Sequence, residues 1–167
     1  MPTITKLDAA RRTLSVAIRL FFAREDAVAV HTLAAAAQAV VRDLAKSESA
    51  TVTSILHDHP DIPENQRRAW INAINRPANF MKHADKDPDQ TLEFAEEEAM
   101  TLILDASLVL TQLTGQVPPA VVTFLGWFAV AHPEMRAAFG RNDIADLCTT
   151  IGIKADDYEW FKSRAAG

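Results

Sequence analysis

The side chains best suited to chemistry gather in one short stretch, residues 76–90, which reads RPANFMKHADKDPDQ. Within twelve residues it places a guanidinium, an amide, an ammonium group, an imidazole and two carboxylates, from Arg76, Asn79, Lys82, His83, Asp85 and Asp87. If helical geometry holds from Arg76 onward, Arg76, Asn79 and His83 lie at i, i+3 and i+7 and share one face. The stretch is the best candidate for a site. The alternative is a polar helix end at which the Arg and the His pair with the two Asp side chains.

An Arg followed closely by a His, placed between a helical hairpin and a long helix, resembles the HEPN superfamily of helical ribonucleases and nucleic-acid-linked modules. The resemblance covers roughly residues 5–115 and departs from the family at Pro77, where a polar residue is usual, so that Asn79 would stand in. It implies metal-independent RNA cleavage at a site assembled across a homodimer. Arg76 would then hold the phosphate, Lys82 would add positive charge, and His83 would transfer the proton.

The segments NFMKHADKDPDQTLEF and VHTLAAAA are also similar to a group of bacterial helical proteins without an assigned activity. That similarity implies a family but no reaction.

A second group of chemical residues lies earlier in the chain. HTLAAAAQAVVRDLA followed by SILHDHPD resembles the opening of an HD-domain phosphohydrolase. The resemblance implies a divalent metal on His31, His57 and Asp58 that activates water for attack on a phosphoester. Asp105 is the natural later ligand, but we expect it to project opposite the apolar stripe of its helix. The alternative for His57 and Asp58 is a polar loop that caps a helix.

Two amphipathic helices are predicted before these groups, from about Thr5 to Ala23 and from about Ala27 to Lys46, with Asp26 as the N-cap of the second. The second is apolar on both faces, which is typical of a central helix. His31 and Gln38 are its polar side chains. They are either core groups hydrogen-bonded to neighbours or the lining of a site between helices.

Prolines mark the expected ends of the next predicted helices. A short helix is predicted at Ile55 and Leu56. Another begins near Pro63 and Glu64, with a buried face of three large apolar side chains, Trp70, Ile71 and Ile74. Pro77 disfavours helical geometry at Arg76, so we expect a break or kink there, followed by a further turn or two up to His83.

A long helix is predicted from Asp87 as N-cap to about Thr114, with Gly115 as its C-terminal stop. Four glutamates in its first half favour a solvated acidic face. Pro118 or Pro119 opens another helix to about Ala131. Its large apolar side chains, Phe124, Trp127 and Phe128, indicate core or a subunit contact. Three short pieces follow: residues 133–139 closed by Gly140, Asn142–Thr150 and Asp156–Ser163.

The length, composition and net charge of the chain limit the class of protein it can be. The chain has 167 residues, of which 49% are hydrophobic and 23% charged, as expected for one globular domain. The net charge of -5 argues against a generic nucleic-acid coat, whose affinity would come from a basic face. The single cysteine, Cys148, favours a reducing compartment and a core position. No signal peptide is predicted, nor an apolar run that would span a bilayer, so we expect a cytoplasmic protein that does not enter the membrane.

The sequence therefore predicts an all-α protein: an antiparallel bundle of four or five helices over residues 1–115, with a C-terminal helical extension over residues 116–167 on the same core. The leading functional hypothesis is a homodimeric, HEPN-like RNA-cleaving or RNA-binding module without a cofactor. Its catalytic residues would be Arg76, Asn79 and His83, and its pocket would be lined by Lys82, His31 and Gln38. The alternatives are a non-catalytic homo-oligomer that binds a small molecule or a regulatory partner, and the metal-dependent phosphohydrolase. Whether the protein is an enzyme is left open.

Overall fold

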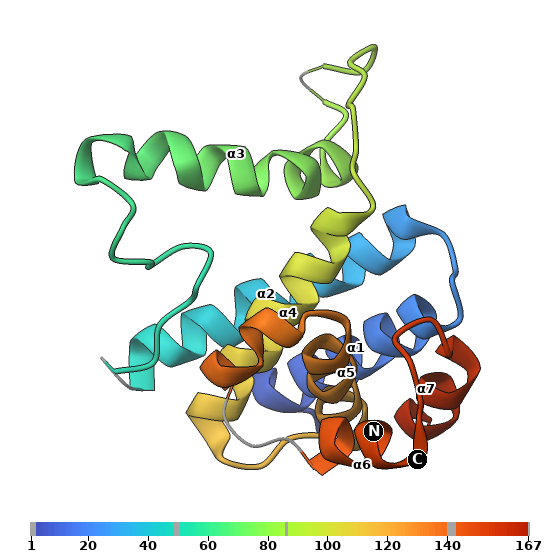
Figure 1. Cartoon of the computed structure of the whole chain (residues 1–167). Helices are drawn as coiled ribbons and strands as arrows, with labels where there is room; N and C mark the ends of the chain where they lie inside the picture. The colour runs from blue at the N-terminus through green and yellow to red at the C-terminus, as the bar shows by residue number, and fades with distance from the viewer. Residues whose placement is uncertain (1–2, 49–50, 86, 140–142, 167) are drawn as a thin grey trace.

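The computed structural model describes residues 3–48, 51–85, 87–139 and 143–166. Within these ranges every regular element is a helix, and the helices pack on one another, which confirms the all-α prediction (Figure 1). In chain order the elements are α1 (Lys6–Phe22), α2 (Ala27–Glu48), α3 (Glu64–Lys82), α4 (Glu97–Thr114), α5 (Pro119–Ala131), the 3-10 helix η1 (Pro133–Phe139), α6 (Asp143–Ile151) and α7 (Tyr158–Ala165).

Helices α1 and α2 form a hairpin whose ends are capped by local side chains. Thr5 and Asp8 make a capping box at the start of α1. The Asp26 carboxylate accepts hydrogen bonds from the backbone N–H groups of Val28 and Ala29, as the sequence predicted for an N-cap. Each cap satisfies backbone donors that a helix start leaves unpaired, and so fixes where the two helices begin.

Helix α2 is the central helix, packed against α1 on one side and α4 on the other. Both of its faces are buried, because alanines such as Ala34, Ala35 and Ala37 let the neighbouring helices approach closely. By length and composition alone α2 could also cross a membrane, with a mean hydropathy of 1.2 over its most apolar window. A core helix of a soluble protein passes the same test.

The C-terminal elements pack around α5 and add an aromatic cluster to the same hydrophobic core. Phe21 lies edge-on to Trp127 with ring centroids 4.9 Å apart, and Phe22 stacks on Phe161. The Trp127 indole donates to the carbonyl of Ala155. The large side chains of α5 are therefore core, the first of the two possibilities that the sequence left open. Cys148 is also buried, and burial raises its pKa.

Helix α3 stands apart from this core. Figure 1 shows it set off to one side of the bundle, and α2 is the only described helix whose backbone lies close to it. The predicted break at Arg76 is wrong, because α3 continues through Pro77, the one fully buried residue of the helix. The proline is buried, and its missing N–H removes one hydrogen bond from the helix. Trp70, predicted to be buried, is 47% exposed.

Two further helix predictions are wrong. Residues 55–57 form turns rather than a short helix, since Ser54 and Asp58 bond to one another across them. The long helix begins at Glu97 and not at Asp87, whose carbonyl instead closes a turn to Gln90. A helix from Asp87 would place Glu93 one turn from Glu96 and Glu97, where like charges repel. Gly115 does end α4, in the left-handed conformation. Gly140 and Asn142, predicted to end and begin short helices, lie outside the described residues.

Candidate functional site

A pocket of about 650 Å³ lies at the C-terminal end of α3 and brings together three of the predicted site residues. Arg76 and Asn79 come from the helix, and His83 is its C-cap, with its backbone N–H bonded to the carbonyl of Asn79. The full lining is Asn72, Arg76, Asn79, Phe80, His83, Asp85, Asp87 and Gln90. Because α3 runs unbroken to Lys82, Arg76 and Asn79 keep the i, i+3 spacing on one face, and the extended C-cap His83 lines the same pocket.

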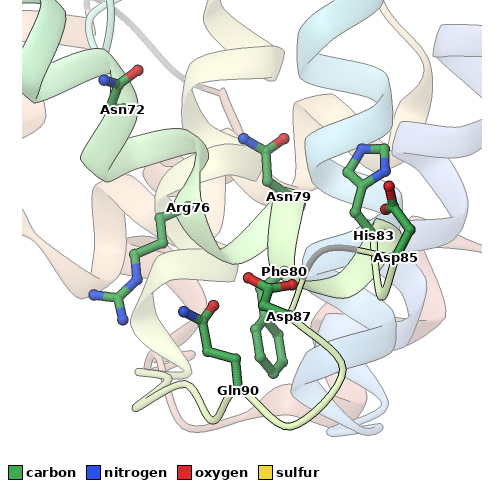
Figure 2. Close-up of a pocket in the computed structure, with 8 residues that line it drawn as sticks. All are labelled: Asn72, Arg76, Asn79, Phe80, His83, Asp85, Asp87 and Gln90. Carbon is green, nitrogen blue, oxygen red and sulfur yellow. The ribbon is translucent and has the colours of Figure 1, made fainter.

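The pocket has two sides. In Figure 2 one side is the end of α3, and the other is the loop after it, from which Asp87 and Gln90 project. The Arg76 guanidinium extends toward one end of the pocket, while His83 stands at the other. Seven residues of helix correspond to a rise of about 10 Å. A ligand that touches both groups must therefore lie along the helix end rather than sit at one point.

The charged groups of this pocket are exposed and make no ion pairs with one another. Within the described ranges, neither Arg76 nor His83 bonds to Asp85 or Asp87. The alternative of a polar helix end held by such pairs is therefore not what the structure contains. One guanidinium and one imidazole stand beside two carboxylates, so the pocket can hold an anionic group at its Arg76 end and hydrogen-bond a polar ligand elsewhere.

Sequence reasoning missed three lining residues and misplaced three others. Asn72 and Phe80 belong to the same helix face as Arg76, but the expected break at Pro77 hid that continuity. Gln90 was assigned to a helix start and instead lies in the facing loop. Lys82, His31 and Gln38, predicted as pocket lining, do not line this pocket.

Gln38 belongs instead to a buried polar cluster, formed with Ser54, His57 and Asp105. Its side-chain nitrogen donates to an Asp105 oxygen at 2.7 Å and lies 3.2 Å from Nδ1 of His57. The Ser54 hydroxyl donates to the Asp105 carboxylate at 2.9 Å and accepts from the backbone N–H of His57. The cluster joins the loop before α3 to α2 and α4.

Protons in this cluster can be assigned from its donors. Both Gln38 hydrogens and the Ser54 hydrogen have acceptors if Nδ1 of His57 is unprotonated, so these bonds favour a neutral imidazole with its proton on Nε2, a buried atom with no partner in the described part of the chain. Burial lowers the pKa of His57, and the charge of Arg42 lowers it further, against smaller opposing effects from Asp105 and the nearby Asn75 amide. The pKa and the hydrogen bonds favour the same neutral form.

The prediction that Asp105 projects away from the core side of its helix is wrong. Its side chain is 0% exposed, because α4 is buried around most of its circumference. Hydrogen bonds from Gln38, Ser54 and the backbone of Leu56 compensate its charge.

The alternative metal set, His31, His57 and Asp58, does not come together. Asp58 accepts from the backbone N–H of Ser54, and His57 faces Gln38 and Ser54. Among the described residues, no group of three His, Cys, Asp or Glu side chains is close enough to hold a metal ion. His31 lies elsewhere, edge-on to the ring of Phe94 with centroids 5.3 Å apart.

Comparisons with known proteins add no family to this geometry. No family model matches the chain, and neither does any curated protein or solved structure.

Proposed function

We propose that the pocket at the end of α3 binds single-stranded RNA and cleaves it without a metal ion. The observation that carries the proposal is the gathering of Arg76, Asn79 and His83 on one exposed, concave helix end. A guanidinium for a phosphate and an imidazole for proton transfer are the groups that cleavage by the RNA 2′-hydroxyl requires.

Each side chain has a role that its position allows. Arg76 binds a phosphate through two parallel hydrogen bonds. His83, at the other end, takes the 2′-hydroxyl proton or protonates the leaving oxygen. Asn79 lies between them and hydrogen-bonds the strand. Phe80 lines the same pocket and offers a ring face on which a base can stack.

The carboxylates limit what can bind. Asp85 and Asp87 repel additional phosphates, and the chain as a whole carries a net charge of -5. The proposed substrate is therefore a short, unpaired segment held by few phosphate contacts, not a duplex held along a basic surface.

The proposal includes a homodimer. Among the described helices only α2 lies close to α3, so the outer face of α3 is open to a second copy that would complete the site. Size-exclusion chromatography with light scattering measures this directly. A monomer at micromolar concentration would contradict this part of the proposal.

The central test is RNA cleavage in EDTA by the full chain and by His83→Ala. We expect the substitution to lower the cleavage rate at least about 100-fold, the lower end of the range for a general acid or base. Because His83 is exposed, circular dichroism should show an unchanged fold. His59→Ala is the matched control, since His59 is also exposed but lies in the loop before α3.

Three outcomes separate the alternatives. Cleavage that survives His83→Ala refutes the catalytic role. RNA binding that Arg76→Ala weakens, without cleavage, supports the non-catalytic binding module. No binding by the wild-type chain across varied single-stranded RNAs refutes the RNA proposal altogether.

A further inference from the structure

The part of α3 that carries Trp70, Ala73 and Ile74 covers a second pocket, of about 280 Å³, which shares no residue with the pocket at Arg76. It lies between α2, α3, α4 and the loop before α3. Its lining residues, apolar except for three, are His31, Leu56, Trp70, Ala73, Ile74, Glu98, Thr101 and Leu102. Its volume is at the small end of the range for sites that bind small molecules.

His31 is the first of two polar groups there without a partner. Its side chain is 1% exposed, and its Nδ1 is buried without any hydrogen bond. Burial lowers the pKa of His31, and the charge of Lys82 lowers it further, so the imidazole is neutral. Buried polar atoms are nearly always hydrogen-bonded in folded proteins. Because His31 lines the pocket as a neutral side chain, it adds no positive charge there.

Glu98 is the second. Its half-buried carboxylate forms no hydrogen bond or ion pair with any residue in the described part of the chain. The remaining polar groups are already engaged, since the Thr101 hydroxyl donates to the carbonyl of Glu97 and the Trp70 indole donates to that of Leu56. The pocket thus offers a carboxylate, a neutral imidazole and the face of an indole ring.

We infer that this pocket binds a small hydrophobic primary amine. A protonated amine donates hydrogen bonds to the Glu98 carboxylate and is attracted to the Trp70 ring, and the neutral His31 beside it does not repel its charge. Leu56, Ile74 and Leu102 pack against the hydrocarbon body, which the volume limits to about one aromatic ring. A carboxylate or phosphate ligand is disfavoured because Glu98 repels it. The inference is independent of the RNA proposal, since the two pockets use different side chains.

The test compares three probes of similar shape by isothermal titration calorimetry with the full chain: 2-phenylethylamine, 2-phenylethanol and 3-phenylpropionate. We expect the amine to bind at least tenfold more tightly than either of the others. Glu98→Gln should remove most of that difference. Glu97→Gln, at the exposed neighbouring position in the same first turn of α4, should leave it unchanged.

The indole N–H resonance of Trp70, assigned by its loss in Trp70→Phe, locates the binding. A shift of that signal on adding the amine supports the site. Equal binding of the amine and the alcohol, an unchanged amine affinity in Glu98→Gln, a Trp70 signal that does not move, or no binding of any probe at millimolar concentration would each overturn the inference.

Discussion

At the scale of single residues, Asp105 is the buried polar side chain that connects α4 to the segment before α3. Its buried carboxylate accepts hydrogen bonds from Gln38, Ser54 and the backbone of Leu56. Since Ser54 and Leu56 belong to the segment that leads into α3, Asp105 determines where that segment attaches to the bundle.

Replacing Asp105 by Ala should therefore lower the free energy of unfolding by about 3 kcal/mol, because three donors would be left buried without an acceptor. Gln112→Ala is the control, two turns further along α4 and exposed, and should change the free energy by less than about 0.5 kcal/mol. Urea unfolding followed by circular dichroism measures both. Equal stability of the two variants would show that the cluster contributes nothing.

Part of this residue-level picture could be predicted from the sequence. The apolar pattern of α2 correctly indicated that His31 and Gln38 are buried, because small residues on both faces imply neighbours on both sides. Their partners could not be predicted. Gln38 bonds to Asp105, which lies 67 positions further along the chain, and the pairing depends on how α2 and α4 cross.

At the scale of elements, α3 is a long helix held mainly at its ends and by Pro77. Near its start, the Trp70 indole donates to the carbonyl of Leu56, and Arg67 donates to the carbonyls of His57 and Ile62. These bonds position the helix that carries the candidate site, although Trp70 and Arg67 lie about 1.7 and 2.5 turns from Arg76.

Arg67→Ala should lower the free energy of unfolding by about 1–2 kcal/mol, since it removes charge-assisted bonds to two carbonyls. Hydrogen exchange of the α3 amides should accelerate more than that of α1. Arg68→Ala is the matched control, because Arg68 is the exposed neighbour and has no partner among the described residues. If Arg68→Ala destabilises as much as Arg67→Ala, the anchoring role of Arg67 is wrong.

Element boundaries were predictable where a cap is local and failed where tertiary contacts decide. Asp26, Gly115 and the prolines before α5 act on adjacent backbone, so the sequence located those ends closely. Pro77 and Asp87 were both misassigned. Pro77 remains inside α3, where it is buried. Asp87 is a suitable N-cap residue but does not start a helix, because a helix from there would bring like-charged glutamates close together.

At the scale of the whole molecule, the two pockets adjoin different parts of the surface of one helix, whose only close neighbour among the described helices is α2. A ligand that fills the pocket at His31 would contact both α3 and α4. It would therefore stabilise the position of the helix that carries Arg76 and His83. A pocket of similar volume, about 670 Å³, lies on the bundle beside α5, α6 and α7, but its lining residues include no histidine, and the acidic net charge works against extended binding.

Because the net charge is negative, the salt dependence of RNA binding tests how many phosphates the whole protein surface neutralises. For single strands, the logarithm of the affinity falls with the logarithm of salt concentration with a slope of about −0.7 for each neutralised phosphate. With the phosphate contact from Arg76 alone, the slope should be roughly −0.7, and Arg76→Ala should reduce it to near zero. Arg12→Ala, an exposed site on α1, should leave it unchanged. Fluorescence anisotropy with a labelled single-stranded RNA, titrated between about 50 and 200 mM salt, gives these slopes. A wild-type slope steeper than about −4 would mean that RNA lies along a much larger basic surface than the end of α3, and the site would have to be sought elsewhere.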